Sequence, residues 1–164
     1  MNKMIKLAAV AAATASVALG AGTANAATAS ATATAEILQQ VAVTKTADLS
    51  FGSLVPSTSA SASVTVAANA AGTRNCGGLT CSGTPTSAAF TVTGASGLAV
   101  TVSGLSGLTA LTGPGANMPI SLSGSTLDMS SGSDTLYVGG NLTVGANQAA
   151  GSYTGNFTVQ VDYQ

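Results

Sequence analysis

Residues 153–163, next to the end of the chain, alternate between apolar and polar side chains with a period of two. One face carries Tyr153, Gly155, Phe157, Val159, Val161 and Tyr163, and the other carries Thr154, Asn156, Thr158, Gln160 and Asp162. Successive strand residues point to opposite faces, so this period predicts a half-buried strand. Such a strand needs a second layer of structure to cover its apolar face.

Strand-like segments recur along the rest of the chain, whereas helical periodicity is absent after residue 26. They are residues 40–46, 51–55, 60–67, 88–93, 98–103, 118–123, 135–138 and 141–144. Clusters of Gly, Pro and Ser separate most of them and supply the backbone angles that turns require. Gly139-Gly140 is interpreted as a tight hairpin turn. Short strands at this spacing predict an all-β fold, an antiparallel two-sheet β-sandwich.

The N-terminus has the pattern of an export signal. Lys3 and Lys6 precede an apolar run over residues 7–20, and Ala24-Asn25-Ala26 offers the small residues that a signal peptidase requires. A membrane anchor is the alternative, but residues 7–20 span only about 21 Å as a helix, against ~30 Å of hydrocarbon. We expect a signal peptide at residues 1–26, cleavage after Ala26, and no stable membrane insertion.

The exported part, residues 27–164, has the size of one domain and a negative charge. Two of the four basic residues are in the signal segment, which leaves Lys45 and Arg74 against five acidic residues, 2 − 5 = −3. Two cations cannot neutralise a track of phosphates, so nucleic-acid binding is excluded, as is binding to an anionic membrane. We expect an extension at residues 27–37 and one domain at residues 38–164.

Cys76 and Cys81 are the only cysteines. In an exported chain a local disulfide is the expected state. A redox pair and a metal site are the alternatives, but redox motifs favour two intervening residues and zinc needs further Cys or His ligands. The loop between the cysteines is short, so we expect the bond to fix one loop and to have a modest effect on global stability.

The sequence offers little to catalysis. It contains no histidine, so a serine nucleophile lacks its usual base. Lys45 is expected to be solvated. Asp128 and Asp134 are expected to form turns, with calcium coordination as the alternative. We expect no enzyme, no metal site and no cofactor.

Three motifs carry a resemblance to known families. Gly151 near the start of the terminal alternation and the penultimate Tyr163 resemble the end of chaperone–usher pilins. Residues 46–52, with Asp-Leu-Ser-Phe-Gly, and residues 136–153 resemble an exported bacterial domain-of-unknown-function family that is similar to spore coat protein U. Together the likeness covers residues 35–164.

The resemblance implies an immunoglobulin-like, pilin-like β-sandwich and a structural role in a surface fibre or fimbrium. It also implies partners: further copies of the chain or related subunits, with a periplasmic chaperone and an outer-membrane usher. The location would be the periplasm and then the cell surface. By the same resemblance, an assembly groove would involve Gly151, Tyr153, Phe157, Val159, Val161 and Tyr163.

The N-terminal extension, residues 27–37, also alternates. Ala29, Ala31, Ala33, Ala35 and Ile37 share one face, and Thr28, Ser30, Thr32, Thr34 and Glu36 share the other. In pilins such an extension completes a neighbouring subunit by β-augmentation, so this segment is a candidate donor strand. Alanine buries little apolar surface, however. Alanines in place of two valine-sized side chains weaken the binding free energy by about 3 kcal/mol, at ~0.8 kcal/mol per buried CH₂. In one alternative the inserted side chains begin later, at Ile37, Val41 and Val43. In another the segment is a frayed linker before a complete domain.

Two functions from different classes therefore remain open. One is a structural subunit of a surface fibre or coat, assembled by donor-strand exchange. The other is a monomeric secreted binding module for carbohydrate or host protein.

Overall fold

The structure is a computed structural model that describes residues 26–164. The chain divides into two units, Met1–Glu36 and Ile37–Gln164. The predicted signal peptide lies outside the described residues apart from its last residue, Ala26. Residues 26–36 form no helix or strand, and each of them is exposed. Within residues 26–164, no helix has the length and apolar character needed to cross a membrane.

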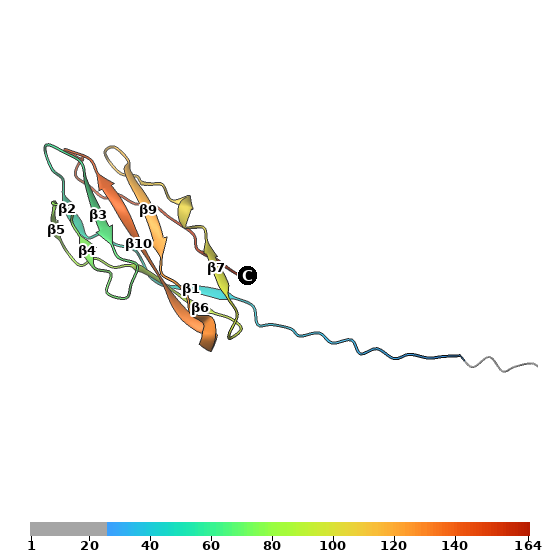
Figure 1. Cartoon of the computed structure of the whole chain (residues 1–164). Helices are drawn as coiled ribbons and strands as arrows, with labels where there is room; N and C mark the ends of the chain where they lie inside the picture. Colours follow the sequence, from blue (N-terminus) through green and yellow to red (C-terminus); the bar gives the residue numbers. More distant parts are fainter. Residues whose placement is uncertain (1–25) are drawn as a thin grey trace, which may run out of the picture. The chain divides into compact units, whose positions relative to one another are not determined.

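The second unit is built from antiparallel strands, which confirms the all-β prediction (Figure 1). The strands are β1 (Ala42–Ala47), β2 (Ser53–Val55), β3 (Ala62–Val66), β4 (Arg74–Asn75), β5 (Thr80–Ser82), β6 (Ala88–Thr93), β7 (Val100–Ser103), β8 (Ala110–Leu111), β9 (Met118–Gly124), β10 (Ser133–Val144) and β11 (Gln160–Tyr163). Two single-turn 3₁₀ helices, η1 (Leu105–Gly107) and η2 (Met129–Ser131), connect them.

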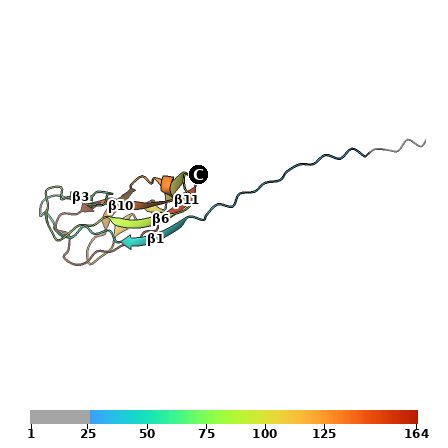
Figure 2. The same cartoon turned by 90° about the horizontal axis from the view of Figure 1, so that it is seen from below.

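Most of these strands join one sheet, in the order β1-β6-β10-β3-β4, with β9 on the other edge of β10 and β8 next to β9. Figure 2 shows β1, β6 and β10 lying side by side. Two small sheets complete the unit: β11 pairs with β7, and β2 pairs with β5. Both small sheets are antiparallel, like the large one.

β10 is one continuous strand, so the hairpin predicted at Gly139-Gly140 is wrong. Along one edge, β10 pairs with β6 as far as Val138 and with β3 from Gly140 onward. At this change of partner the backbone of β3 and its following loop comes close, and a Cβ on Gly139 would lie 2.6 Å from the Ala68 nitrogen. The glycines allow a close backbone approach inside a strand, which is the other common use of glycine there.

The core consists of two clusters, and β10 contributes to both. One centres on Phe51, Val64, Val66, Met118, Ile120, Leu142 and Val144, and the other on Ala88, Phe90, Val92, Met129, Leu136, Val138 and Val161. In the second cluster, side chains of β7 and β11 pack against β6 and β10. β6 alternates between buried and half-buried residues along its whole length, as expected for a strand with one face on the core.

The terminal strand is shorter than predicted. Only residues 160–163 belong to a ladder, and Thr154 forms an isolated bridge with Thr112. The predicted faces nevertheless persist: Phe157, Val159, Val161 and Tyr163 are at least half-buried, while Asn156, Thr158 and Asp162 are exposed. Side-chain burial therefore follows the period of two even where the backbone has no ladder partner.

Candidate functional site

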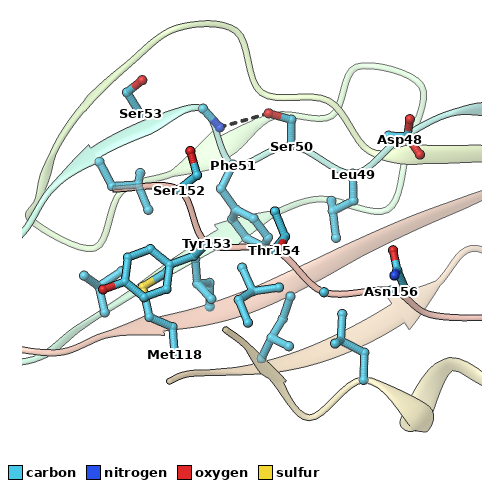
Figure 3. A pocket seen from close by; sticks show the side chains of 18 of the residues that line it. Asp48, Leu49, Ser50, Phe51, Ser53, Met118, Ser152, Tyr153, Thr154 and Asn156 are labelled. Atoms are coloured by element: carbon cyan, nitrogen blue, oxygen red, sulfur yellow. Dashed lines mark hydrogen bonds between the residues drawn. The ribbon is translucent and has the colours of Figure 1, made fainter. Parts of the chain in front are cut away.

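A groove of about 860 Å³ lies between two segments, residues 45–56 and residues 148–157. Side chains from β6, β8, β9 and β10 form its base, among them Phe90, Leu111, Met118, Ile120, Leu142 and Val144. Figure 3 shows the two segments with the groove between them. The order of the labels reverses from one segment to the other, from Asp48 to Ser53 above and from Asn156 to Ser152 below. The two walls thus run in opposite directions.

The first wall follows β1 and ends with β2. Ser50 exchanges two backbone hydrogen bonds with Thr86, of 2.8 and 3.0 Å, on the side away from the groove. Leu49 and Phe51 point into the groove (Figure 3), and Phe51 is buried. At the start of this wall Lys45 and Asp48 form an exposed ion pair of 2.7 Å. They are the only charged residues that line the groove, so the site is close to neutral. Its walls also carry uncharged polar side chains, whereas its base is apolar.

The second wall is the segment that leads into β11. Thr154 exchanges two backbone hydrogen bonds of 2.9 Å with Thr112. Because backbone groups of neighbouring residues in an extended chain point to opposite sides, those of Tyr153 and Gly155 point away from Thr112. Phe157 lines one end of the groove and packs edge-on against Phe90, with ring centroids 6.1 Å apart.

Both walls present backbone that no strand pairs with. Among the described residues β2 has a single ladder partner, β5, on one edge, and its residues Ser53 and Leu54 line the groove. Residues 155–159, which are also within the described part of the chain, belong to no ladder and to no isolated bridge. Unpaired donors and acceptors along an extended segment form a template for an additional strand. The groove therefore combines an apolar base with backbone along both walls that no strand pairs with.

Tyr153 anchors the far end of the groove. Its hydroxyl donates to the Ala149 carbonyl at 3.0 Å and accepts from the Gly115 amide at 3.0 Å. The Gln148 side-chain amide donates to the same hydroxyl at 2.8 Å. These bonds fix the loop that forms the first part of the second wall.

Gly151 lies in this loop and lines the groove. Its φ of +143° is a conformation that favours glycine, and an added Cβ would lie 2.5 Å from Pro114 Cγ. A side chain here would thus strain the backbone and collide with Pro114. Glycine is required at this position for the shape of the loop.

Three residues predicted for the groove lie elsewhere. Val159 and Val161 pack in the second core cluster. Tyr163 lies beyond them, where its hydroxyl donates to the Gln39 carbonyl at 2.7 Å and accepts from the Ala95 amide at 2.6 Å. Tyr163 therefore fixes the chain where the domain begins, whereas Gly151, Tyr153 and Phe157 line the groove.

The candidate donor residues are all accessible. Ala29, Ala31, Ala33 and Ala35 are exposed, and Ile37 is 96% exposed. In the alternative with inserted side chains at Ile37, Val41 and Val43, two of the three residues belong to strands or core of the chain's own domain. Val43 is paired with Val92 in the β1–β6 ladder, and Val41 packs against the second core cluster of its own domain.

The predicted disulfide between Cys76 and Cys81 is confirmed. Cys81 is in β5, directly opposite Leu54 of β2. The disulfide loop therefore belongs to the strand that supports the first wall of the groove, a connection that the sequence alone did not suggest.

Arg74 supports the same wall and was missed by the sequence analysis. Its Nη1 donates to the carbonyls of Phe51 at 2.6 Å and Ser82 at 3.0 Å, and its Nη2 donates to the Gly83 carbonyl at 3.3 Å. The planar guanidinium can bind several carbonyls at once, which a lysine cannot do in the same way. No local pattern in the sequence signals such a contact, because Arg74 in β4 is 23 residues from Phe51, which lies between β1 and β2.

Replacing Arg74 by alanine is expected to lower the free energy of unfolding by about 1–3 kcal/mol, because the carbonyls of Phe51 and Ser82 lose a charged donor. Lys45→Ala is the matched control: it removes an ion pair whose side chains are 58% and 81% exposed, with an expected cost below about 1 kcal/mol. Urea unfolding of both variants measures the difference. Equal destabilisation would contradict the role given to Arg74.

Asp128 and Asp134 organise a turn. Asp128 accepts from the Ser130 amide at 3.0 Å, and Asp134 accepts from the Asp128 amide at 2.7 Å. The hydrogen bonds from Ser130 lower the pKa of Asp128. Over residues 26–164, no three His, Cys, Asp or Glu side chains gather in a way that could hold a metal ion. The two aspartates act in the structure as the turn formers that the sequence predicted.

Comparison with known proteins gives one family. A family model described as a domain of unknown function, DUF4402, matches residues 41–163, from the residue before β1 to the end of β11. No curated protein and no solved structure matches the chain significantly. The likeness to pilins and to spore coat protein U stays a prediction. Since the match spans most of the sequence, the chain belongs to the DUF4402 family of domains of unknown function.

Proposed function

We propose that the chain is a structural subunit of an exported bacterial surface fibre or coat, assembled by donor-strand exchange. In this proposal residues 38–164 form an immunoglobulin-like β-sandwich that lacks one strand. The large sheet would be one layer, and the β7–β11 sheet, which packs against β6 and β10, would belong to the other. The role is structural and includes no catalytic step.

The observation that carries the proposal is the groove between residues 45–56 and 148–157. It combines an apolar base with two walls whose facing backbone has no strand partner. A small ligand would satisfy one or two backbone groups at most. An extended peptide could pair along both walls and insert alternate side chains, which is the chemistry of β-augmentation.

The proposed occupant is the N-terminal extension, residues 27–37, of another subunit. It alternates with a period of two, and its described residues are exposed and belong to no strand. At ~3.3 Å per residue an extended segment of this length spans about 36 Å, similar to the ~40 Å that residues 45–56 would span. One extension and one groove per chain would lead to head-to-tail growth.

The proposed location and partners follow from export. The signal pattern at residues 1–26 and the Cys76–Cys81 disulfide both suit an oxidising compartment. A subunit with an open groove would need protection in the periplasm, so a chaperone and an outer-membrane usher are the proposed assembly partners. Its final place would be the cell surface.

Sedimentation velocity of the chain that starts at Ala27 tests the proposal. We expect an open series of oligomers that grows with protein concentration, because head-to-tail contacts do not close. A single closed dimer would contradict the proposal. A monomer at every concentration would also contradict it, and would favour a monomeric secreted binding module.

A further inference from the structure

The groove and the segment proposed to fill it differ in the size of their apolar groups. This inference rests on the proposed function, since it concerns the partner of the same groove. The groove has a volume of about 860 Å³ and is lined by large side chains, including Phe51, Leu54, Leu108, Leu111 and Phe157. Leu54, Leu108 and Leu111 are only half-buried in the single chain. An occupant with large side chains could cover them.

The extension supplies only methyl groups to this space. Its inward face consists of Ala29, Ala31, Ala33 and Ala35, followed by one large residue, Ile37. Ile37 is two residues before Gln39, whose carbonyl is held by Tyr163 of the same chain. At ~3.3 Å per residue that leaves Ile37 within about 7 Å of a fixed point on its own domain. Ile37 therefore cannot reach far into the groove of a neighbour.

The charge around the groove adds a second criterion for the strand that it would bind. Lys45 and Asp48 are its only charged lining residues, and they neutralise each other at 2.7 Å. No unpaired charge in the groove would attract an acidic or a basic strand. The chemistry of the site thus favours an uncharged strand with aliphatic side chains at alternate positions.

We infer that the tight-binding occupant of this groove is such a strand from a second protein, and that the chain's own extension is its weaker competitor. The weaker fit means that self-assembly through the extension is reversible. The partner is defined by its chemistry: at least three Val, Leu or Ile residues spaced two apart in an extended segment that pairs with both walls.

The expected difference in affinity between an aliphatic strand and the chain's own extension follows from the free energy of hydrophobic transfer. Each additional buried methylene strengthens binding about fourfold. Three alanine-to-valine replacements add two carbons each, which sets an upper limit of about 4,000-fold. Incomplete burial and the ordering of side chains reduce this gain, so we expect at least about 100-fold.

Three synthetic peptides that cover residues 27–37 provide the test, each labelled with a dye at its N-terminus. The first has the native sequence, the second carries Ala31→Val, Ala33→Val and Ala35→Val, and the third carries Ser30→Val, Thr32→Val and Thr34→Val. The second and third have the same number of added valines on opposite faces. Fluorescence anisotropy with the complete chain from Ala27, at a concentration where it is monomeric, gives the dissociation constants.

We expect the peptide with valines at positions 31, 33 and 35 to bind at least about 100-fold more tightly than the other two. The same peptide should dissociate oligomers of the chain in sedimentation. Equal affinity of the native peptide and this variant would overturn the inference while leaving the proposed function intact. Equal affinity of the two valine peptides would indicate unspecific apolar binding and would also overturn it. If no peptide binds and the chain does not self-associate, the proposed function fails, and the inference fails with it.

Discussion

Deleting residues 28–37 from the chain that starts at Ala27 is expected to abolish its ordered head-to-tail oligomers. The deleted chain retains the groove between residues 45–56 and 148–157 but can no longer fill a neighbour's groove. Its open apolar surface and unpaired strand edges are expected to make it prone to aggregation. A free peptide of residues 27–37 should raise its melting temperature with increasing concentration, because it binds only the folded form. The gain approaches about 2.7 kcal/mol at a peptide concentration 100 times the dissociation constant.

Sedimentation velocity and thermal unfolding measure both effects. If the deleted chain forms the same oligomers as the complete chain, residues 28–37 are not the donor. If it stays soluble, monomeric and equally stable, and the peptide has no effect, the extension is a linker. The secreted binding module would then be the better interpretation of the fold.

A valine at position 155 is expected to block the groove from within. Gly155 interrupts the large side chains of the second wall, and a Cβ there would lie 2.6 Å from Leu108 Cδ1 and 3.0 Å from Leu111 Cδ2. Both are side-chain ends at the base of the groove, which can shift when the groove is empty. With a donor strand present, the valine would crowd the inserted side chains. Overpacking of this kind costs about 1–3 kcal/mol, so we expect self-association to weaken about 5- to 150-fold.

Thr158→Val is the matched control for Gly155→Val. Thr158 is exposed, lies on the other face of the same segment and does not line the groove. Both variants should unfold within about 1 kcal/mol of the parent chain.

A mixing experiment gives a sharper result. The deleted chain contributes a groove and the Gly155→Val chain contributes an extension, so together they should form a 1:1 dimer and no larger species. Unchanged oligomers in the Gly155→Val chain would contradict the proposed site.

The sequence predicted the strands that have one face on the core. β6 coincides with the predicted segment at residues 88–93, and β9 exceeds its predicted segment by only one residue, because both alternate cleanly. The short strands β4, β5 and β8 were missed, since two or three residues do not establish a period. The error at Gly139-Gly140 has another origin: turns and close backbone approaches both select glycine.

The site was predictable in its chemistry but only partly in its location. The alternation at residues 153–163 correctly separates inward from outward side chains. It cannot reveal where hydrogen-bonded pairing begins, so Val159, Val161 and Tyr163 were assigned to the same groove as Tyr153 and Phe157. Pairing depends on β7, which runs beside residues 160–163 only. Arg74 and Phe51 of the first wall are far apart in the sequence, so their contact comes entirely from the tertiary fold.

The pairing of β10 with β3, β6 and β9 also sets the order in which the chain can fold. A ribosome or an export channel releases the chain from its N-terminus, so β3 and β6 both emerge long before the strand that joins them. β10 is complete only at residue 144. Without β10, β1 and β6 would have only each other as partners, and an isolated two-stranded ribbon is marginally stable in water. The large sheet therefore forms late and through distant contacts, which is typical of folding in milliseconds to seconds. A chain of this topology can complete its large sheet only after residue 144 has been released.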